Sequence, residues 1–285
     1  MASNLFRGSV ERDFMADEHY LFGAGSYDTA PGTRRALGAR IFGRWYFYWF
    51  NFNIFSKTGR LFRKGRCDKA TQISQSNRNV RLVERCGGRI HLRGLEHLAE
   101  RHGAPAVLIG NHMSLLETAL MHAIVREHLD FTFVIKASLM KIPHFRNIMT
   151  GLEAIQIGRS NPREDLRAVL EEGKERLGRG KSVVIFPQGT RSTTFDPAHF
   201  SSIGVKLALA AGVPVIPFAL KTDFLGNGRF IKDLGPIFPE NDVWFEFGPA
   251  MTPTGNGREE QQRTIEFIVS RLKMWRKDAD DPNAA

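Results

Sequence analysis

The sequence has few cysteines and no grouping of side chains suited to a structural metal. Of its 285 residues only Cys67 and Cys86 are cysteines, and neither has further Cys or His at metal-ligand spacing. Disulfide-stabilised domains and zinc modules need more cysteines in tighter patterns. We therefore expect two reduced thiols, no bound metal and a protein that faces the cytosol.

Long apolar runs and a leader pattern are also missing. The opening residues, MASNLFRGSVERDF, carry charges where the apolar core of a signal peptide would lie, so no secretory signal is expected. The segment richest in aromatic residues, 41–55, is fifteen residues long and contains Arg44. A helix that crosses a bilayer needs about 20 apolar residues. This segment is therefore too short to be predicted as a membrane span.

Acidic residues are outnumbered by basic ones. The chain has 40 Lys and Arg against 30 Asp and Glu, a formal net charge of +10. Such an excess favours an anionic partner, which is nucleic acid, an acidic membrane surface or a phosphorylated substrate. No nucleic-acid-binding motif accompanies the charge, so nucleic acid is not expected. The hydrophobic fraction of 42% and the length allow one large domain with a substantial core.

The N-terminal third divides into two predicted segments. Residues 1–33 are polar and turn-rich and are expected to form a mobile arm. Residues 34–88 are predicted to be a helical segment that lies in one leaflet, because 41–55 holds two Trp, two Tyr and five Phe. Trp and Tyr favour the headgroup zone, and clustered cations favour anionic lipid. The flanking basic residues are Arg34, Arg35, Arg40, Lys57, Arg60, Arg63, Lys64 and Arg66.

These features predict a peripheral or monotopic protein on the cytoplasmic face of a membrane. Two alternatives remain for the aromatic segment. It could be a helix packed on the main domain, or a surface that stacks on single-stranded nucleic acid.

From about residue 89 onward, short runs rich in Val and Ile alternate with longer amphipathic segments. This alternation predicts an α/β fold with a mixed, largely parallel sheet flanked by helices, over 89–277, followed by a frayed tail at 278–285. Sites in such sheets form in loops beyond the carboxyl ends of strands. The predicted strands are 106–110, 131–136, 154–158, 182–186, 213–220 and 243–248. The predicted helices are 115–129, 162–178, 202–212 and 258–275.

A candidate catalytic pair follows the first of these strands. The sequence after 106–110 reads NHMSLLE, which places His112 in the turn before a helix. Ser114 and Glu117 have the spacing of a capping box, which puts Glu117 in the first helical turn. The bend at Ser114 could let the carboxylate fold back onto the imidazole and fix its tautomer. The alternative is a carboxylate that only caps a helix.

This motif resembles NHxxxxD, the signature of the glycerolipid acyltransferase family that includes 1-acyl-sn-glycerol-3-phosphate acyltransferases. Glu117 stands where the family usually has Asp, and the extra methylene moves the carboxylate by about 1.5 Å. The resemblance implies that His112 is the general base and that Glu117 is its carboxylate partner, within an acyltransferase domain over 89–277.

A second family block resembles residues 136–159 of this chain. Lys136 and Arg159 match the pattern, whereas Arg146 and Glu153 stand where Gly is frequent. By resemblance, Lys136 and Arg159 hold the phosphate of the acceptor. Solvated surface charges are the alternative.

The third block is the most specific, because residues 186–192 read FPQGTRS where the family has FPEGTRS. Gly189 lets the backbone turn tightly, Thr190 offers a hydroxyl donor, and Arg191 presents a planar fork to phosphate oxygens. Gln188 replaces the family Glu, and since an amide cannot shuttle a proton, no acid catalysis is expected there. The fourth block, 213–218, is expected to be an edge or core strand that lines an acyl pocket.

Together the four blocks imply transfer of a fatty acyl group to the free hydroxyl of a lysophospholipid. The sequence has no G-x-S-x-G motif, so we expect direct attack without a covalent intermediate. The donor is an acyl thioester, either acyl-CoA or an acyl carrier protein, and no cofactor is expected besides this co-substrate. The alternatives are another lysolipid acceptor and a non-catalytic lipid-binding relative. The length of the acyl chain, the exact acceptor lipid and the oligomeric state of the protein stay open.

Overall fold

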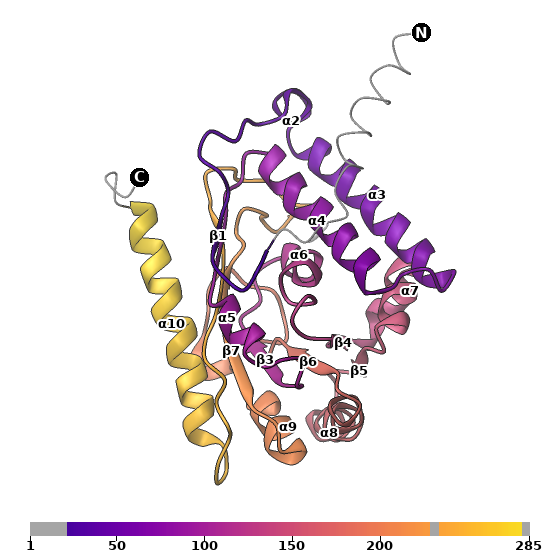
Figure 1. Cartoon of the computed structure of the whole chain (residues 1–285), viewed down its shortest axis with the longest axis vertical. Helices are drawn as coiled ribbons and strands as arrows, with labels where there is room; N and C mark the ends of the chain where they lie inside the picture. Colours follow the sequence, from indigo (N-terminus) through magenta and orange to yellow (C-terminus); the bar gives the residue numbers. More distant parts are fainter. Residues whose placement is uncertain (1–21, 229–233, 281–285) are drawn as a thin grey trace.

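The structure, a computed structural model, describes residues 22–228 and 234–280 of the chain. Within these residues eight strands form one sheet in the order β1-β2-β8-β7-β3-β6-β4-β5 (Figure 1). The strands are β1 (Tyr27–Asp28), β2 (Ile90–Arg93), β3 (Val107–Gly110), β4 (Phe131–Lys136), β5 (Ile155–Ile157), β6 (Ser182–Ile185), β7 (Val215–Lys221) and β8 (Val243–Phe247).

Most neighbouring strands run in the same direction. Five of the seven pairs are parallel, and only β1–β2 and β7–β8 are antiparallel. Parallel neighbours need crossover connections, which place helices on both faces of the sheet. The predicted α/β class with a mixed, largely parallel sheet is confirmed.

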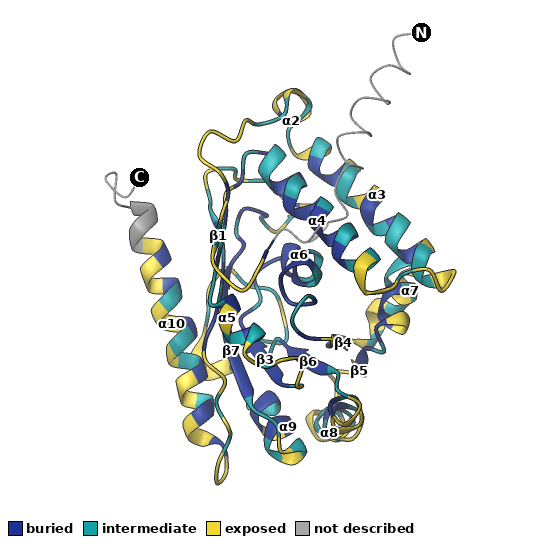
Figure 2. Cartoon of the chain, viewed as in Figure 1, coloured by how far each residue is buried: buried dark blue, intermediate teal, exposed yellow. Residues whose placement is uncertain are grey.

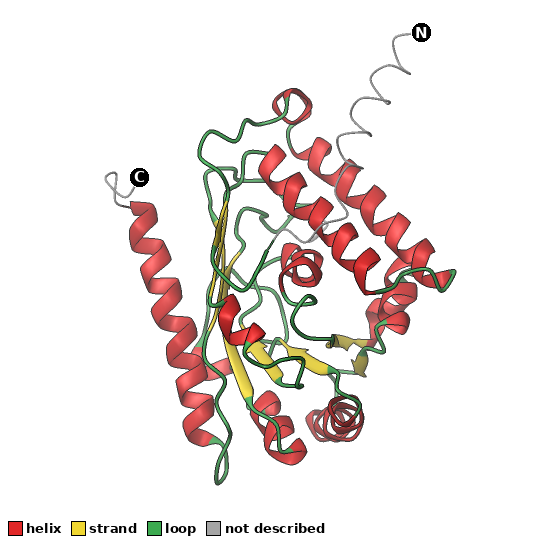
Figure 3. Ribbon diagram, in the orientation of Figure 1, coloured by secondary structure: helices red, strands yellow, loops and turns green. Residues whose placement is uncertain are grey.

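Helices cover both faces of this sheet (Figure 3). The chain places α8, α9 and α10 on one face, and α4, α6 and α7 with α3 on the other (Figure 1). The helices are α2 (Leu37–Phe42), α3 (Arg44–Arg63), α4 (Lys69–Arg85), α5 (Leu95–Ala99), α6 (Leu116–Ile124), α7 (Pro143–Gly151), α8 (Pro162–Gly178), α9 (Ile203–Ala211) and α10 (Arg258–Asp280), with two 3-10 turns, η1 (Ala137–Lys141) and η2 (Pro197–His199).

The core lies along the central strands. Every residue of β3, β6 and β7 is buried (Figure 2), as expected for Val- and Ile-rich strands covered on both faces. Because β7 lies between β3 and β8, the sequence block 213–218 belongs to an interior strand and not to an edge.

The predicted helical segment 34–88 contains α2, α3 and α4. Helix α3 packs closely on α7, since a Cβ built on Gly59 would lie 2.9 Å from the carbonyl oxygen of His144. In the described residues, no helix combines the length and the apolar character that a membrane crossing requires. One outer face nevertheless carries large apolar side chains that are 59–66% exposed: Leu37, Ile41, Phe42, Trp45, Trp49 and Phe52.

The six predicted strands agree with β3 to β8 within two residues at each end, and the predicted helices differ more. The helix predicted over 115–129 ends at Ile124, because buried Arg126 donates to the carbonyl of Phe131, 2.6 Å away, and holds the chain in a turn before β4. The closing helix continues to Asp280, past the predicted start of the tail at 278.

The predicted arm 1–33 also needs correction where it is described. Residues 1–21 lie outside the described residues, but Tyr27 and Asp28 form β1. This two-residue strand depends on partners more than 50 residues away, because it pairs with β2 and Tyr27 donates to Glu84 at 2.6 Å. Local sequence carries no signal for such a strand.

Candidate active site

The predicted site lies at the carboxyl edge of two neighbouring strands. In the parallel pair β3–β6, Ile109 is opposite Ile185. The turns that follow, 111–115 and 186–192, therefore leave the sheet at the same edge. This register brings the first and third sequence blocks together although about 75 residues separate them.

The structure brings His112 and Glu117 into direct contact. The Nδ1 atom of His112 is hydrogen-bonded to Oε2 of Glu117. The Glu117 side chain is fully buried, whereas that of His112 is 19% exposed. Helix α6 begins only at Leu116, so the chain bends between the two residues as the sequence predicts.

The other oxygen of Glu117 accepts three further hydrogen bonds. The N–H groups of Met113 and Ser114 donate to Oε1 at 2.8 and 2.6 Å, and the hydroxyl of Thr222 donates at 2.5 Å. The bond from Ser114 N–H is one half of the predicted capping box. The other half is absent, since Ser114 Oγ accepts from the N–H of Leu116 at 3.1 Å and not from residue 117.

The turn 186–192 holds the backbone of His112 on both sides. The N–H of His112 donates to Oε1 of Gln188 at 2.6 Å, and the carbonyl of His112 accepts from the N–H of Ser192 at 2.9 Å. The ring of Phe186 stacks on the imidazole with centroids 4.4 Å apart and planes 21° from parallel. Gln188 therefore acts here as an acceptor that joins the two turns, a role that the sequence did not predict.

A buried amide ties the same turn to the strand on its other side. Both polar atoms of the Asn111 side chain bond to the backbone of Leu220 in β7, at 2.8 and 2.9 Å. Asn111 is fully buried. Its place beside His112 in the sequence motif thus has a structural reason. Thr222 directly follows β7. Its contact with Glu117 could have been predicted only from the knowledge that β7 is the parallel neighbour of β3.

Arg159 reaches the turn from the far edge of the sheet. Its guanidinium donates to the carbonyl of Gly189. The Arg159 backbone has φ 62°, a left-handed conformation, and its N–H donates to the Asp165 carboxylate at 3.0 Å. Burial lowers the pKa of Arg159, and the charge of Asp165 opposes that shift. Gly189 also has a positive φ, 71°, which fits the tight turn predicted for this block.

The remaining predicted residues lie in the turn 186–192 or farther along the sheet. Thr190 is exposed and Arg191 is half-buried within the turn that holds His112. Lys136 is exposed at the end of β4. Strand β6 separates β4 from β3, so Lys136 begins about 10 Å from β3, the strand that precedes His112.

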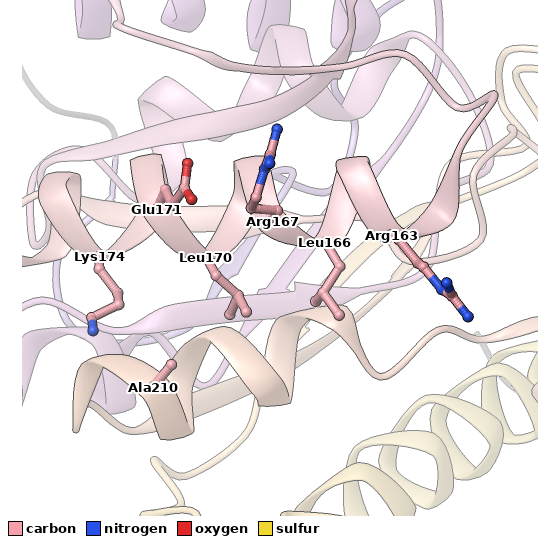
Figure 4. Close-up of a pocket in the computed structure, with 7 residues that line it drawn as sticks. All are labelled: Arg163, Leu166, Arg167, Leu170, Glu171, Lys174 and Ala210. Carbon is pink, nitrogen blue, oxygen red and sulfur yellow. The ribbon is translucent and has the colours of Figure 1, made fainter.

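A separate groove lies between α8 and α9. It has a volume of about 630 Å³ and is lined by both apolar and charged residues: Leu166, Leu170, Ala210, Arg163, Arg167, Glu171 and Lys174 (Figure 4). None of its lining residues belongs to the predicted site. In the part of the chain that the structure describes, no cluster of three or more His, Cys, Asp or Glu residues could hold a metal ion.

Comparison with known proteins identifies the family to which this domain belongs. The model of the acyltransferase family matches residues 89–221. A 1-acyl-sn-glycerol-3-phosphate acyltransferase from Pseudomonas aeruginosa is 31% identical over 189 residues, which is 66% of this chain and 68% of that protein. The chloroplast protein LPAT1 of Arabidopsis thaliana, of the same name, is 29% identical over 143 residues, 50% of this chain but only 38% of that protein.

A solved structure shares the fold. The crystal structure of the 1-acyl-sn-glycerophosphate acyltransferase from Thermotoga maritima aligns with a TM-score of 0.63 at 20% identity, covering 83% of this chain and 95% of that one. At that identity the likeness speaks for the fold. The sequence match to the bacterial relative goes further and shows that this chain belongs to the acyltransferase family that includes the 1-acyl-sn-glycerol-3-phosphate acyltransferases.

Proposed function

We propose that this protein transfers a fatty acyl group from an acyl thioester to the free hydroxyl of 1-acyl-sn-glycerol-3-phosphate, giving phosphatidic acid. The observation that supports this most directly is the His112–Glu117 pair, held at the sheet edge by the FPQGTRS turn. The names of the relatives support the acceptor. Both acyl-CoA and an acyl carrier protein could carry the donor.

In the proposed mechanism His112 acts as the general base. Its Nδ1 is bonded to Glu117, so the neutral ring presents Nε2 to the acceptor hydroxyl. As Nε2 takes the hydroxyl proton, the oxygen attacks the thioester carbonyl and forms a C–O bond. Collapse of the tetrahedral intermediate breaks the C–S bond, and the departing thiolate takes the proton back from the imidazolium.

Glu117 has two tasks in this scheme. Its hydrogen bond fixes the tautomer and orientation of the ring, and its charge stabilises the imidazolium that forms during attack. Burial of the carboxylate strengthens the second effect, because water does not screen it. The four donors on its two oxygens offset the cost of burying the charge.

We assign the cationic residues around the turn to the phosphate of the acceptor. Arg159 already donates to Gly189 in this turn, and Arg191 and Thr190 belong to it. Arginine suits a phosphate because its planar fork matches two oxygens at once. Lys136, which starts farther away, has a long stem and would act as a peripheral charge on the same anion.

The exposed apolar face of α2 and α3 supports association with a membrane. An aromatic surface rimmed by basic residues favours the headgroup region of an anionic leaflet. We infer a peripheral or monotopic attachment on the cytoplasmic face, which would deliver the lipid acceptor to the site without an aqueous step. No nucleic acid partner and no cofactor beyond the thioester are part of this proposal.

Replacing His112 tests the proposal. Purified His112→Ala, assayed in vesicles with 1-acyl-sn-glycerol-3-phosphate and both kinds of thioester, should lose about 100- to 10,000-fold in kcat, since the base is removed. Product is measured by mass spectrometry. His199→Ala is the matched control, because that ring is 83% exposed and bonds only to Asp196 in a surface turn.

Two results would contradict the proposal. Wild-type turnover in His112→Ala would remove the dyad mechanism. Vesicle binding by the wild-type protein without transfer from any thioester would instead identify a non-catalytic lipid-binding relative.

A further inference from the structure

Thr222 contacts the proposed dyad but has no role in the proposed mechanism. It is fully buried and follows β7 directly, so it reaches the carboxyl edge of the sheet from the opposite side to the FPQGTRS turn. Its hydroxyl lies 2.5 Å from Oε1 of Glu117 and 2.9 Å from the hydroxyl of Ser114. It thus contacts the carboxylate partner of His112 and not the ring itself.

The direction of these hydrogen bonds follows from which atoms can donate and which can only accept. An ionised carboxylate only accepts, so the hydroxyl proton of Thr222 has to point at Glu117. Thr222 Oγ1 then accepts from the hydroxyl of Ser114, and Ser114 Oγ accepts from the N–H of Leu116 at the start of α6. A directed chain of donors therefore runs from the first turn of α6 into the buried carboxylate.

The two carboxylate oxygens of Glu117 have different hydrogen-bond partners. Oε1 receives the two backbone N–H groups and the Thr222 hydroxyl, which leaves Oε2 for Nδ1 of His112. Among these donors Thr222 is the only one that does not come from the 112–117 segment. It therefore fixes the carboxylate relative to the sheet, whereas the backbone donors fix it only relative to its own turn.

We propose that Thr222 is a positioning residue whose hydroxyl holds the Glu117 carboxylate in the orientation that serves His112. This inference rests on the proposed function, because it requires that His112 is the base. It also gives a reason for Glu at a position where the family usually has Asp. On the same backbone an Asp carboxylate is shorter by about 1.5 Å, so it could not keep both the His112 and the Thr222 contacts.

The test is a steady-state kinetic series on the full-length protein with the thioester that supports turnover. Thr222→Val keeps the shape but removes the hydroxyl, and kcat should fall about 10- to 100-fold with KM for both substrates unchanged. Thr222→Ser restores the hydroxyl and should restore kcat. Thr264→Val is the matched control, a buried threonine in α10 whose hydroxyl donates to the carbonyl of Glu260, and it should leave kcat unchanged.

A double-mutant cycle separates positioning from a general effect on the fold. If Thr222 acts through Glu117, adding Thr222→Val to Glu117→Ala should lower kcat no further. A further fall in that background, or a loss that Thr222→Ser does not restore, would overturn the role of Thr222. Wild-type kcat in Thr222→Val would overturn it too, provided that His112→Ala shows its expected loss. Wild-type turnover by His112→Ala would instead refute the dyad mechanism on which this inference rests.

Discussion

At the scale of the residue, Glu153 shows how a departure from the family pattern is compensated. Glu153 stands where Gly is frequent, and its backbone has φ 57°, in the left-handed region that Gly adopts without strain. Its carboxylate pairs with Lys181 at 2.8 Å and with Arg176 and Arg179. The hydrogen bond from Lys181 is the main reason that the pKa of Glu153 is lowered. These pairs favour the charged form and offset part of the backbone strain.

The strain at this position can be measured with two variants. Glu153→Gly and Glu153→Ala both lose the ion pairs, but only Ala retains a Cβ in the left-handed conformation. We expect the Gly variant to be more stable than the Ala variant by about 1 kcal/mol. Denaturant unfolding of both proteins measures the difference. Equal stabilities would mean that the backbone at 153 relaxes out of the left-handed region.

The proposed catalytic residues show how much of a site a sequence motif alone can predict. The contact between His112 and Glu117 was predictable, because both residues lie in one short segment between the end of a strand and the first turn of a helix. Thr222 and Gln188 were not predictable as partners of this pair. Each reaches it from a segment at least 70 residues away, and only the strand order decides which segments share an edge.

At the scale of the element, the two faces of α3 have different surroundings. Its inner face packs on α4 and α7, with Phe47 and Ile54 buried. Its outer face leaves Trp45 and Trp49 59% and 65% exposed. An exposed apolar patch of this kind marks an interaction site. Together with the flanking cations, it is the basis of the proposed membrane attachment.

Vesicle binding tests the outer face of α3. Replacing both Trp45 and Trp49 by Gln removes two large apolar groups from the predicted interface, so partition onto phosphatidylglycerol vesicles should weaken at least tenfold, about 1.4 kcal/mol. Cosedimentation measures the bound fraction. The control replaces Val269 and Met274, 40% and 42% exposed on α10 at the other side of the molecule (Figure 1), by Gln. Equal loss in both proteins would contradict a specific membrane face.

At the scale of the whole molecule, a charged cluster connects the N-terminal strands β1 and β2 with the segment just before the C-terminal strand β8. His91 in β2 bonds Asp28 of β1 at 2.6 Å, lies 3.4 Å from Asp242 before β8, and stacks on Trp244. Burial raises the pKa of Asp28, but hydrogen bonds from Arg93 and His91 outweigh it and the net shift is downward. Asp242 behaves alike, with burial opposed by His91 and Arg89.

These shifts predict how stability depends on pH. Both carboxyls have folded pKa values below their ordinary 3.8, so the folded protein binds fewer protons than the unfolded chain in acid. Their contribution is complete above about pH 5 and is lost as the pH falls below 4. Asp242→Asn should therefore lower stability by about 1 kcal/mol at pH 7 and by less at pH 3. Thermal unfolding at both pH values checks this, and a deficit that is equal at both would contradict the linkage.

The sequence by itself determined six of the strands and the pairing of His112 with Glu117. Val- and Ile-rich runs and amphipathic segments are local patterns, so six strands and the largely parallel α/β class could be read from them. The tertiary structure alone decided which loops meet. The order β7-β3-β6 sets Thr222, His112 and the FPQGTRS turn side by side, and pairing with β2 creates β1 from two residues. Such contacts depend on the order and register of the strands. They join residues far apart in the chain, and local sequence patterns do not predict which of these residues meet.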